Sequence, residues 1–539
     1  MMPARRPSAL AVAAGTCVTV AFTGLLLWPA VGRGQLLYRD FVSVPEPSLT
    51  ARTLGLDGPA PRAVPLDLVI ALLHPVVPSG LQQLVLLAGA LLLAGVGVTV
   101  LLRRWGPVAT VVGAALATWS PYAVERLLLG QPPTLLAVST LPWIVVVARE
   151  AATRRRWLVL TVVAALPAAL TPVGGLTAAA AALVAAVAFR RAPVRDLAAV
   201  AALALAWCSP WLVAVLAGHA DVGQSDGAQA FAVRAAGVHG VVDVLTGGGV
   251  WSEAATPASR LRWWPLVVGC LTFGLAVVGA AGLRRQRRLG FACLVAPPVV
   301  ALLLATPTGI SVLAAAQSVP GVALVRDTHR WVGISAMTVA VLAPLGLLGL
   351  LGLLATLHRT RPRARPRVSG RGPGHPLGLA VALAAAAVGV SLAVLTVPDA
   401  AARLHAAYRP VTFPSSWERV VAAVGERSAL VLPWQPMRSV GWAGAEPFLD
   451  PLPLALRGPV TVARDLLVAR DGRLLRVGGA DPQESASWAQ GGIDADQLRR
   501  QGIERVVEWQ GTPGRLPVRH DGLVEVLRDN EFVVWSVRD

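Results

Sequence analysis

The sequence contains no lysine, few charged side chains and only four cysteines. All 48 basic residues are arginines, and charged residues make up 14% of the 539. Soluble domains carry about a quarter of charged residues, so this composition argues against a soluble enzyme. The hydrophobic fraction of 55% excludes a disordered chain, and the length predicts at least two folding units. The cysteines show no CxxC spacing and lie inside apolar runs, so we interpret them as small apolar residues.

Eleven apolar runs are long enough to cross the roughly 30 Å of hydrocarbon in a bilayer. They lie near residues 9–31, 81–102, 107–123, 133–148, 157–171, 173–189, 197–217, 264–283, 289–305, 331–357 and 377–397. The fifth and sixth runs form one apolar stretch that is broken at Thr171-Pro172, with arginines at both ends. We therefore predict a helical hairpin there. The first run is too long for a signal-peptide core and is expected to remain as an anchor.

The arginines gather between alternate apolar runs. With the N-terminus in the cytoplasm, the inner segments hold 21 arginines and two acids, whereas the outer loops hold ten of each. The positive-inside rule thus predicts a multi-pass protein of the cell membrane, with a cytoplasmic N-terminus and an extracytoplasmic C-terminus. Because the basic charge lies in short inner loops, a nucleic-acid partner is excluded.

The sequence divides into a transmembrane module, 1–397, and an extracytoplasmic tail, 398–539. Residues 358–375 carry six arginines and no acid, which predicts a cytoplasmic linker within the first part, where contact with membrane lipids is open. In the tail, the pattern predicts helices at 415–425 and 494–501 and strands at 428–433, 503–509, 523–528 and 532–537. This alternation predicts a small α/β domain. Six of the 17 tryptophans lie in the tail, where sugar stacking and core packing are both open.

The middles of the predicted spans are essentially free of ionisable residues, which argues against an ion-coupled transporter and against a lipid flippase. Chemistry is therefore expected in the outer loops. Asp40 follows the first run and can act as a general base on a hydroxyl, or pair with Arg39 in a solvated loop. The apolar segment 64–77 is expected along the membrane interface, and the loop 218–263 is expected to be solvated.

Two further groups of charged residues lie at the outer ends of spans. Glu125 and Arg126 end the third run, where a charge must be paired or used, so a salt-bridged helix end and a substrate contact are both open. Arg326, His329 and Arg330 precede the tenth run. Two arginines and a histidine at headgroup level suit a lipid phosphate, and headgroup anchoring is the alternative.

Several stretches of the sequence resemble the GT-C superfamily of polytopic glycosyltransferases, more closely its actinobacterial-type members. They are Tyr38-Arg39-Asp40, the stretch from Glu125 to Gln131, the stretch from Arg326 to Trp331, and two tail motifs, Leu432-Pro433-Trp434-Gln435-Pro436 and Leu449-Asp450-Pro451. The resemblance covers the layout of the whole chain, although each motif is short.

The resemblance implies a polyprenyl-phosphate sugar as donor and an envelope glycan or glycolipid as acceptor, with inverting transfer on the outer face. It implies that Asp40 is the catalytic base. The residues implied at the substrate and its phosphate are Arg326, His329, Arg330, Glu125, Arg126 and Gln131. Many relatives carry two adjacent acids in the first outer loop, whereas Arg39 and Phe41 flank Asp40. No metal ligands follow from the resemblance, and a divalent metal stays open. The alternative function is a non-catalytic GT-C-like envelope scaffold or polysaccharide-binding protein.

Overall fold

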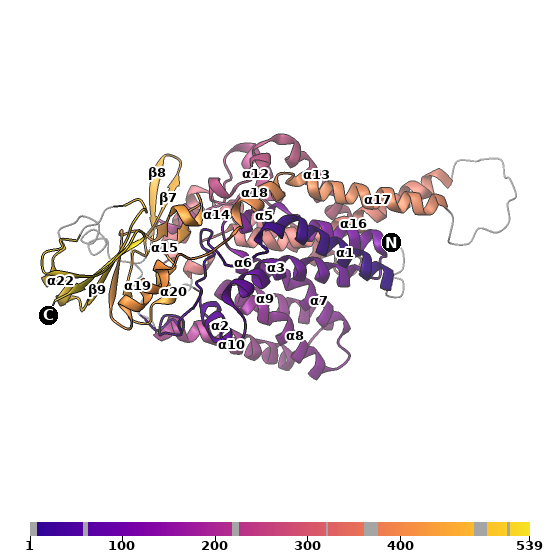
Figure 1. Cartoon of the computed structure of the whole chain (residues 1–539). Helices are drawn as coiled ribbons and strands as arrows, with labels where there is room; N and C mark the ends of the chain where they lie inside the picture. The colour runs from indigo at the N-terminus through magenta and orange to yellow at the C-terminus, as the bar shows by residue number, and fades with distance from the viewer. Residues whose placement is uncertain are drawn as a thin grey trace.

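The structure, a computed structural model, consists of a helical bundle at one end and a β-sheet region at the other (Figure 1). It describes residues 8–57, 63–217, 226–317, 319, 322–359, 376–478, 493–514 and 518–538. The first helix begins at the end of the bundle that lies away from the sheet (Figure 1). The predicted linker 358–375 lies outside the described residues, except that a helix continues to Arg359.

Ten helical segments in the described chain are long and apolar enough to cross a membrane. They are α1 (Ala9–Leu27), α3 (Ser79–Leu102), α4 (Pro107–Thr118) continued by α5 (Pro121–Leu128), α6 (Pro132–Ser139) continued by α7 (Leu141–Glu150), α9 (Pro172–Ala185), α10 (Val194–Ala217), α13 (Trp263–Ala281), α14 (Arg287–Leu304), α16 (His329–Arg359) and α17 (Pro376–Thr396). Each corresponds to one of the predicted apolar runs.

The fifth predicted crossing, near 157–171, forms a shorter helix. α8 (Arg154–Ala169) has 16 residues and is therefore roughly 24 Å long, less than the hydrocarbon thickness. The predicted hairpin is present, since α8 packs against α9. Thr171 caps α9 at the turn by accepting a hydrogen bond from the amide of Gly174 at 3.1 Å. The count of crossing-length helices is thus ten rather than eleven among the described residues, and the sidedness of the termini stays a prediction.

Short helices cover the sheet-side end of the bundle. They are α2 (Leu66–Leu73), α11 (Gly227–Ala230), α12 (Gly237–Leu245), α15 (Pro307–Ala316) and α18 (Ala400–Ala407). α2 lies within the segment expected along the interface and leaves Leu72 and Leu73 exposed. The prediction of a solvated loop over 218–263 is wrong for its described part, because Asp243, Val250 and Arg260 are buried. Residues 218–225 lie outside the described chain.

The tail forms the predicted α/β arrangement. A five-stranded sheet has the order β10 (Leu523–Arg528), β11 (Phe532–Val537), β9 (Arg505–Trp509), β3 (Ala429–Leu432) and β6 (Val460–Thr461). β3 runs parallel to both β6 and β9, while β11 is antiparallel to β9 and β10. α19 (Ser416–Val424) and α22 (Ala495–Arg500) are the two predicted helices, and α20 (Leu452–Ala455) is an additional short helix.

The strands alternate their side chains between two apolar clusters. Ala429 and Val431 of β3 pack with α19, whereas Leu430 and Leu432 pack with α22. This period of two places the helices on opposite faces of the sheet. Three two-stranded pairs complete the fold: β1 (Gln35–Leu36) with β2 (Pro410–Val411), β4 (Met437–Arg438) with β5 (Phe448–Leu449), and β7 (Leu466–Arg470) with β8 (Arg473–Val477).

The loop between α1 and α2 contributes to the core of the tail. Leu37, Val42 and Val44 belong to the same buried cluster as Trp417 and Phe532 of the sheet region. Strand β1 of the loop also pairs with β2 at the start of the tail. The tail therefore buries apolar side chains that come from the beginning of the chain.

We expect residues 398–539 to be less stable when they are produced alone. Burial of a leucine or valine contributes about 1.5–3 kcal/mol, so the loss of Leu37, Val42 and Val44 removes on the order of 5 kcal/mol. Thermal unfolding of the isolated tail, compared with the tail fused to residues 34–57, measures this difference. Equal melting temperatures for the two proteins would contradict the shared core.

Candidate functional site

Helix α5 places charged side chains inside the protein. Ser120 caps the helix by accepting a hydrogen bond from the amide of Ala123 at 3.2 Å, and Pro121 occupies its first turn. The helix ends before Gly130, whose φ of 72° lies in the left-handed region. Glu125 and Arg126 lie in its last turns, and both are fully buried.

A bidentate ion pair joins α5 to the segment before α16. Arg126 donates Nη1 to Asp327 Oδ2 at 2.6 Å and Nη2 to Oδ1 at 2.9 Å. Arg330 Nε lies 3.1 Å from the same Oδ2. Burial raises the pKa of the Asp327 carboxyl, but the Arg126 guanidinium outweighs burial and holds this pKa well below its usual range. Asp327 is therefore an ionised anchor for two arginines.

Gln131 connects this ion pair to Asp40. Arg126 Nη1 donates to Gln131 Oε1 at 3.0 Å, and Gln131 Nε2 donates to Asp40 Oδ2 at 3.0 Å. Asp40 is exposed, and its Oδ1 accepts no hydrogen bond from the part of the chain that the structure describes. The three stretches singled out in the sequence thus converge, since a continuous path of polar contacts runs from Asp40 to Arg330.

Two tyrosines hold the C-terminal end of α5. The last carbonyls of a helix have no partner within the helix. Tyr38 donates to the carbonyl of Leu128 at 3.0 Å, and Tyr408 donates to that of Leu127 at 2.6 Å. Burial raises the pKa of both phenols, so the hydroxyls remain protonated donors.

The turn at Gly130 touches the loop that carries Asp40. A Cβ at position 130 would lie 2.7 Å from the Tyr38 carbonyl oxygen and 2.9 Å from the Asp40 amide nitrogen. Only glycine permits both this close approach and the positive φ without strain. The backbone of Asp40 is therefore positioned directly against the end of α5.

Arg326 and Arg330 form a cationic pair beside Asp327. The Arg326 guanidinium lies 5.0 Å from the centre of the Phe231 ring and forms no ion pair with any residue that the structure describes. Burial, and then the positive charge of Arg330, lower the pKa of Arg326. An anion bound between them would relieve this repulsion, which is a property of phosphate sites.

A second buried cluster lies beside the first. Glu125 Oε2 accepts from the amide of Val250 at 3.0 Å and lies 3.3 Å from His329 Nε2. Asp243 accepts from Arg260 Nε at 2.8 Å, and burial raises the pKa of this carboxyl despite the arginine. The sequence did not single out Arg260 or assign Asp243 a site; the apolar neighbours of Asp243 in α12 were the only signal of its burial. Glu125 and His329 as substrate contacts stay predictions.

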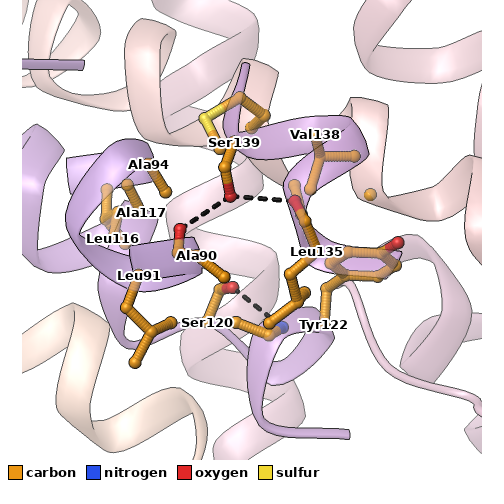
Figure 2. Close-up of a pocket in the computed structure, with 14 residues that line it drawn as sticks. Ala90, Leu91, Ala94, Leu116, Ala117, Ser120, Tyr122, Leu135, Val138 and Ser139 are labelled. Atoms are coloured by element: carbon orange, nitrogen blue, oxygen red, sulfur yellow. Dashed lines mark hydrogen bonds between the residues drawn. The ribbon is translucent and has the colours of Figure 1, made fainter. Parts of the chain in front are cut away.

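A small cavity lies on the other side of Tyr122 (Figure 2). It is lined mostly by apolar residues of α3, α4, α6 and α16, and the Ser139 hydroxyl donates to the carbonyls of Ala90 and Leu135 at its wall. Tyr122 donates to the carbonyl of Arg330 at 3.3 Å and so separates the cavity from the charged residues. The cavity contains none of Asp40, Arg326 or Arg330.

No residues can be named as ligands of a divalent metal. Within the described ranges, no group of three or more histidine, cysteine, aspartate or glutamate side chains is placed to hold a metal ion.

Comparison with known proteins identifies a structural relative. No protein-family model matches the chain, and no curated protein sequence matches it. The structure is similar to the cryo-EM structure of the arabinofuranosyltransferase AftD from mycobacteria, with a TM-score of 0.55 and 16% sequence identity. The match covers 98% of this chain and 40% of that chain, so this chain spans two-fifths of the enzyme's length. The predicted fold is confirmed, because membrane-length helices are followed by a mixed sheet and the arrangement is similar to that structure.

We expect Asp327→Asn to destabilise the protein by about 3–5 kcal/mol, because it leaves the fully buried Arg126 without a counter-charge. Thermal unfolding in detergent measures the loss. The control is Asp57→Asn, which removes a partly exposed ion pair with Arg52 and should change stability by less than about 1 kcal/mol. Equal effects of the two substitutions would contradict a special role for the buried pair.

The contribution of Asp327 should also depend on pH. Its pKa is lower in the folded protein than the value of about 3.9 in an unfolded chain, so the stabilisation is complete above roughly pH 5 and declines as the pH falls below about 4. The difference in unfolding free energy between the wild type and Asp327→Asn should therefore shrink on acidification. A difference that stays constant between about pH 6 and 3 would show that Asp327 is not held ionised.

Proposed function

We propose that this chain is a membrane glycosyltransferase that moves a sugar from a polyprenyl-phosphate donor to a hydroxyl of an envelope glycan or glycolipid, with inversion, at the outer face of the cell membrane. The similarity of its fold to an arabinofuranosyltransferase supports this class of reaction. The observation that carries the proposal is the polar path from the exposed carboxylate of Asp40 to Arg330, through Gln131, Arg126 and Asp327.

In the proposed reaction, the base Asp40 lies on one side of the reacting carbon, and the phosphate site of Arg326 and Arg330 lies on the other. Asp40 Oδ1 takes the proton of the acceptor hydroxyl as its oxygen attacks the anomeric carbon of the sugar. The bond from that carbon to the phosphate oxygen breaks, and the electron pair leaves with the polyprenyl phosphate. Arg326 and Arg330 stabilise the negative charge on the leaving phosphate. Attack from the face opposite the phosphate inverts the anomeric configuration.

The buried residues orient these groups. The Gln131 amide donates to Asp40 Oδ2, which leaves Oδ1 for the acceptor. Asp327 Oδ2 lies 3.1 Å from Nε of Arg330, and the two terminal nitrogens of Arg330 are assigned to the phosphate. His329 and Glu125 are fully buried and contact each other. In this proposal, their contact holds α5 against α16.

Substitution of Asp40 tests the proposal. Asp40→Asn keeps the size of the side chain but removes the base, and we expect transfer from a radiolabelled polyprenyl-phosphate sugar to fall about 10²–10⁴-fold. The control is Glu46→Gln, an exposed acid of the same loop, which should retain normal turnover. Thermal unfolding should show both variants to be as stable as the wild type.

Normal product from Asp40→Asn would remove Asp40 from the mechanism. If the wild type transfers no sugar from any polyprenyl-phosphate donor but binds envelope polysaccharide, and Asp40→Asn binds it equally well, the chain is a scaffold rather than an enzyme.

A further inference from the structure

The two tail motifs that the proposed function leaves without a role lie on one hairpin. The chain leaves β3 at Leu432 and forms the antiparallel pair of β4 and β5, in which Arg438 faces Phe448 in register. The first motif, 432–436, leads into β4, and the second, 449–451, leaves β5. The hairpin therefore includes or adjoins every residue of both motifs.

A fully buried ion pair fixes the base of this hairpin. Arg438 donates Nε and Nη2 to Asp450 Oδ2 at 3.0 and 2.7 Å, and Nη1 to the carbonyl of Pro433 at 2.8 Å. Asp450 Oδ1 accepts from the amide of Leu452 at 3.0 Å. The exposed fractions of the two residues are 0% and 5%. The pair thus joins β4 to the residue that follows β5. It also bonds to the chain before β4, at Pro433, and after β5, at Leu452.

The free side of β5 binds the backbone next to Asp40. The amide of Arg39 donates to the carbonyl of Pro447 at 3.0 Å, and the amide of Leu449 donates to the carbonyl of Arg39 at 2.8 Å. These bonds hold Arg39 at a φ of 48°, in the left-handed region that costs a non-glycine residue energy. A strained residue keeps this geometry only while its surroundings impose it.

The loop that carries Asp40 is therefore clamped between two surfaces. Gly130 at the end of α5 touches it on one side, and Pro447 to Leu449 bind it on the other. The Arg39 side chain adds a contact from Nε to the Tyr38 hydroxyl at 3.1 Å and a longer ion pair with Glu446 at 3.8 Å. Release of either surface would let the Arg39 backbone relax, and the Asp40 carboxylate would then leave the amide of Gln131.

We propose that Arg438 and Asp450 are positioning residues for Asp40: by fixing the β4–β5 hairpin they hold Arg39 in its strained conformation and so aim the carboxylate of the next residue. Neither residue touches Asp40. The catalytic part of this inference rests on the proposed function, whereas its structural part concerns only the conformation of residues 37–42. A residue with a merely stabilising role would affect the whole sheet region rather than this loop.

Hydrogen exchange of the full-length protein in detergent tests the structural part without any substrate. We expect Asp450→Asn, and more mildly Arg438→Lys, to raise the exchange rates of the amides of Arg39 and Leu449 by about tenfold or more, while β9 and β11 keep their protection. The matched control is Glu508→Gln. Glu508 is equally buried and contacts His520 at 2.8 Å in the same sheet region, but no contact of it with the first loop is described. Its substitution should leave residues 37–42 unchanged.

Turnover tests the catalytic part. Because Arg326 and Arg330 are untouched, kcat for sugar transfer should fall at least about tenfold in Asp450→Asn, with KM for the donor unchanged, and Arg438→Lys should retain more activity.

The proposal would be overturned if the amides of residues 37–42 stayed protected from hydrogen exchange in a variant whose β4–β5 hairpin had lost its protection. An equal fall of kcat in Glu508→Gln would also overturn it. If the exchange result holds while Asp40→Asn is fully active, the proposed function fails and the structural coupling stands.

Discussion

The structure depends on one buried ion pair between residues 201 positions apart. Transferring a guanidinium or a carboxylate from water into a protein interior costs several kcal/mol for each ion, and only a well-formed partner offsets this cost. Arg126 and Asp327 meet that condition with two parallel hydrogen bonds. The pair fixes α5, at the end of the third membrane-length segment, against the start of α16. Glu125 and Gln131, on either side of Arg126, then reach His329 and Asp40.

The loop between α1 and α2 contacts both halves of the molecule. Its apolar side chains, Leu37, Val42 and Val44, complete the core of the sheet region, whereas Asp40 points to the helical bundle through Gln131. Loops usually tolerate change because little packs against them. This loop is constrained on both faces, so a substitution in the tail core and a substitution at the end of α5 act on the same short segment.

Hydrophobic run length and the period-two pattern predicted much of this fold. The apolar runs identified ten of the membrane-length segments, and the alternation around 428–433 and 503–509 located β3 and β9 to within two residues. The run 157–171 was counted as a crossing, but the helix that it forms, α8, has only 16 residues and is too short to be one of the membrane-length segments. A common site for Asp40, Arg126 and Arg330 was implied by the family resemblance.

The partners within the site were beyond the reach of the sequence. Arg126 has several acids at the outer level, and only the packing of α5 against α16 selects Asp327. The pair of Asp243 and Arg260 was missed for the same reason, since a glycine-rich loop resembles a solvated one until the helices around it are in place. The sign of a charge and its position relative to the predicted spans can be read from the local sequence. The ion-pair partner of that charge depends on how the helices pack in the assembled bundle.

The capping of α5 by Tyr38 and Tyr408 has a consequence for biogenesis. A ribosome synthesises Leu127 about 280 residues before Tyr408, so the carbonyl of Leu127 at first accepts a hydrogen bond from the nearby amide of Gly130 and none from Tyr408. It acquires its final hydrogen bond only after the chain has been translated beyond the last membrane-length helix. The end of α5 is thus completed late, after the tail has been made, and a prematurely terminated chain lacks the bond from Tyr408 even though every residue of that helix is present.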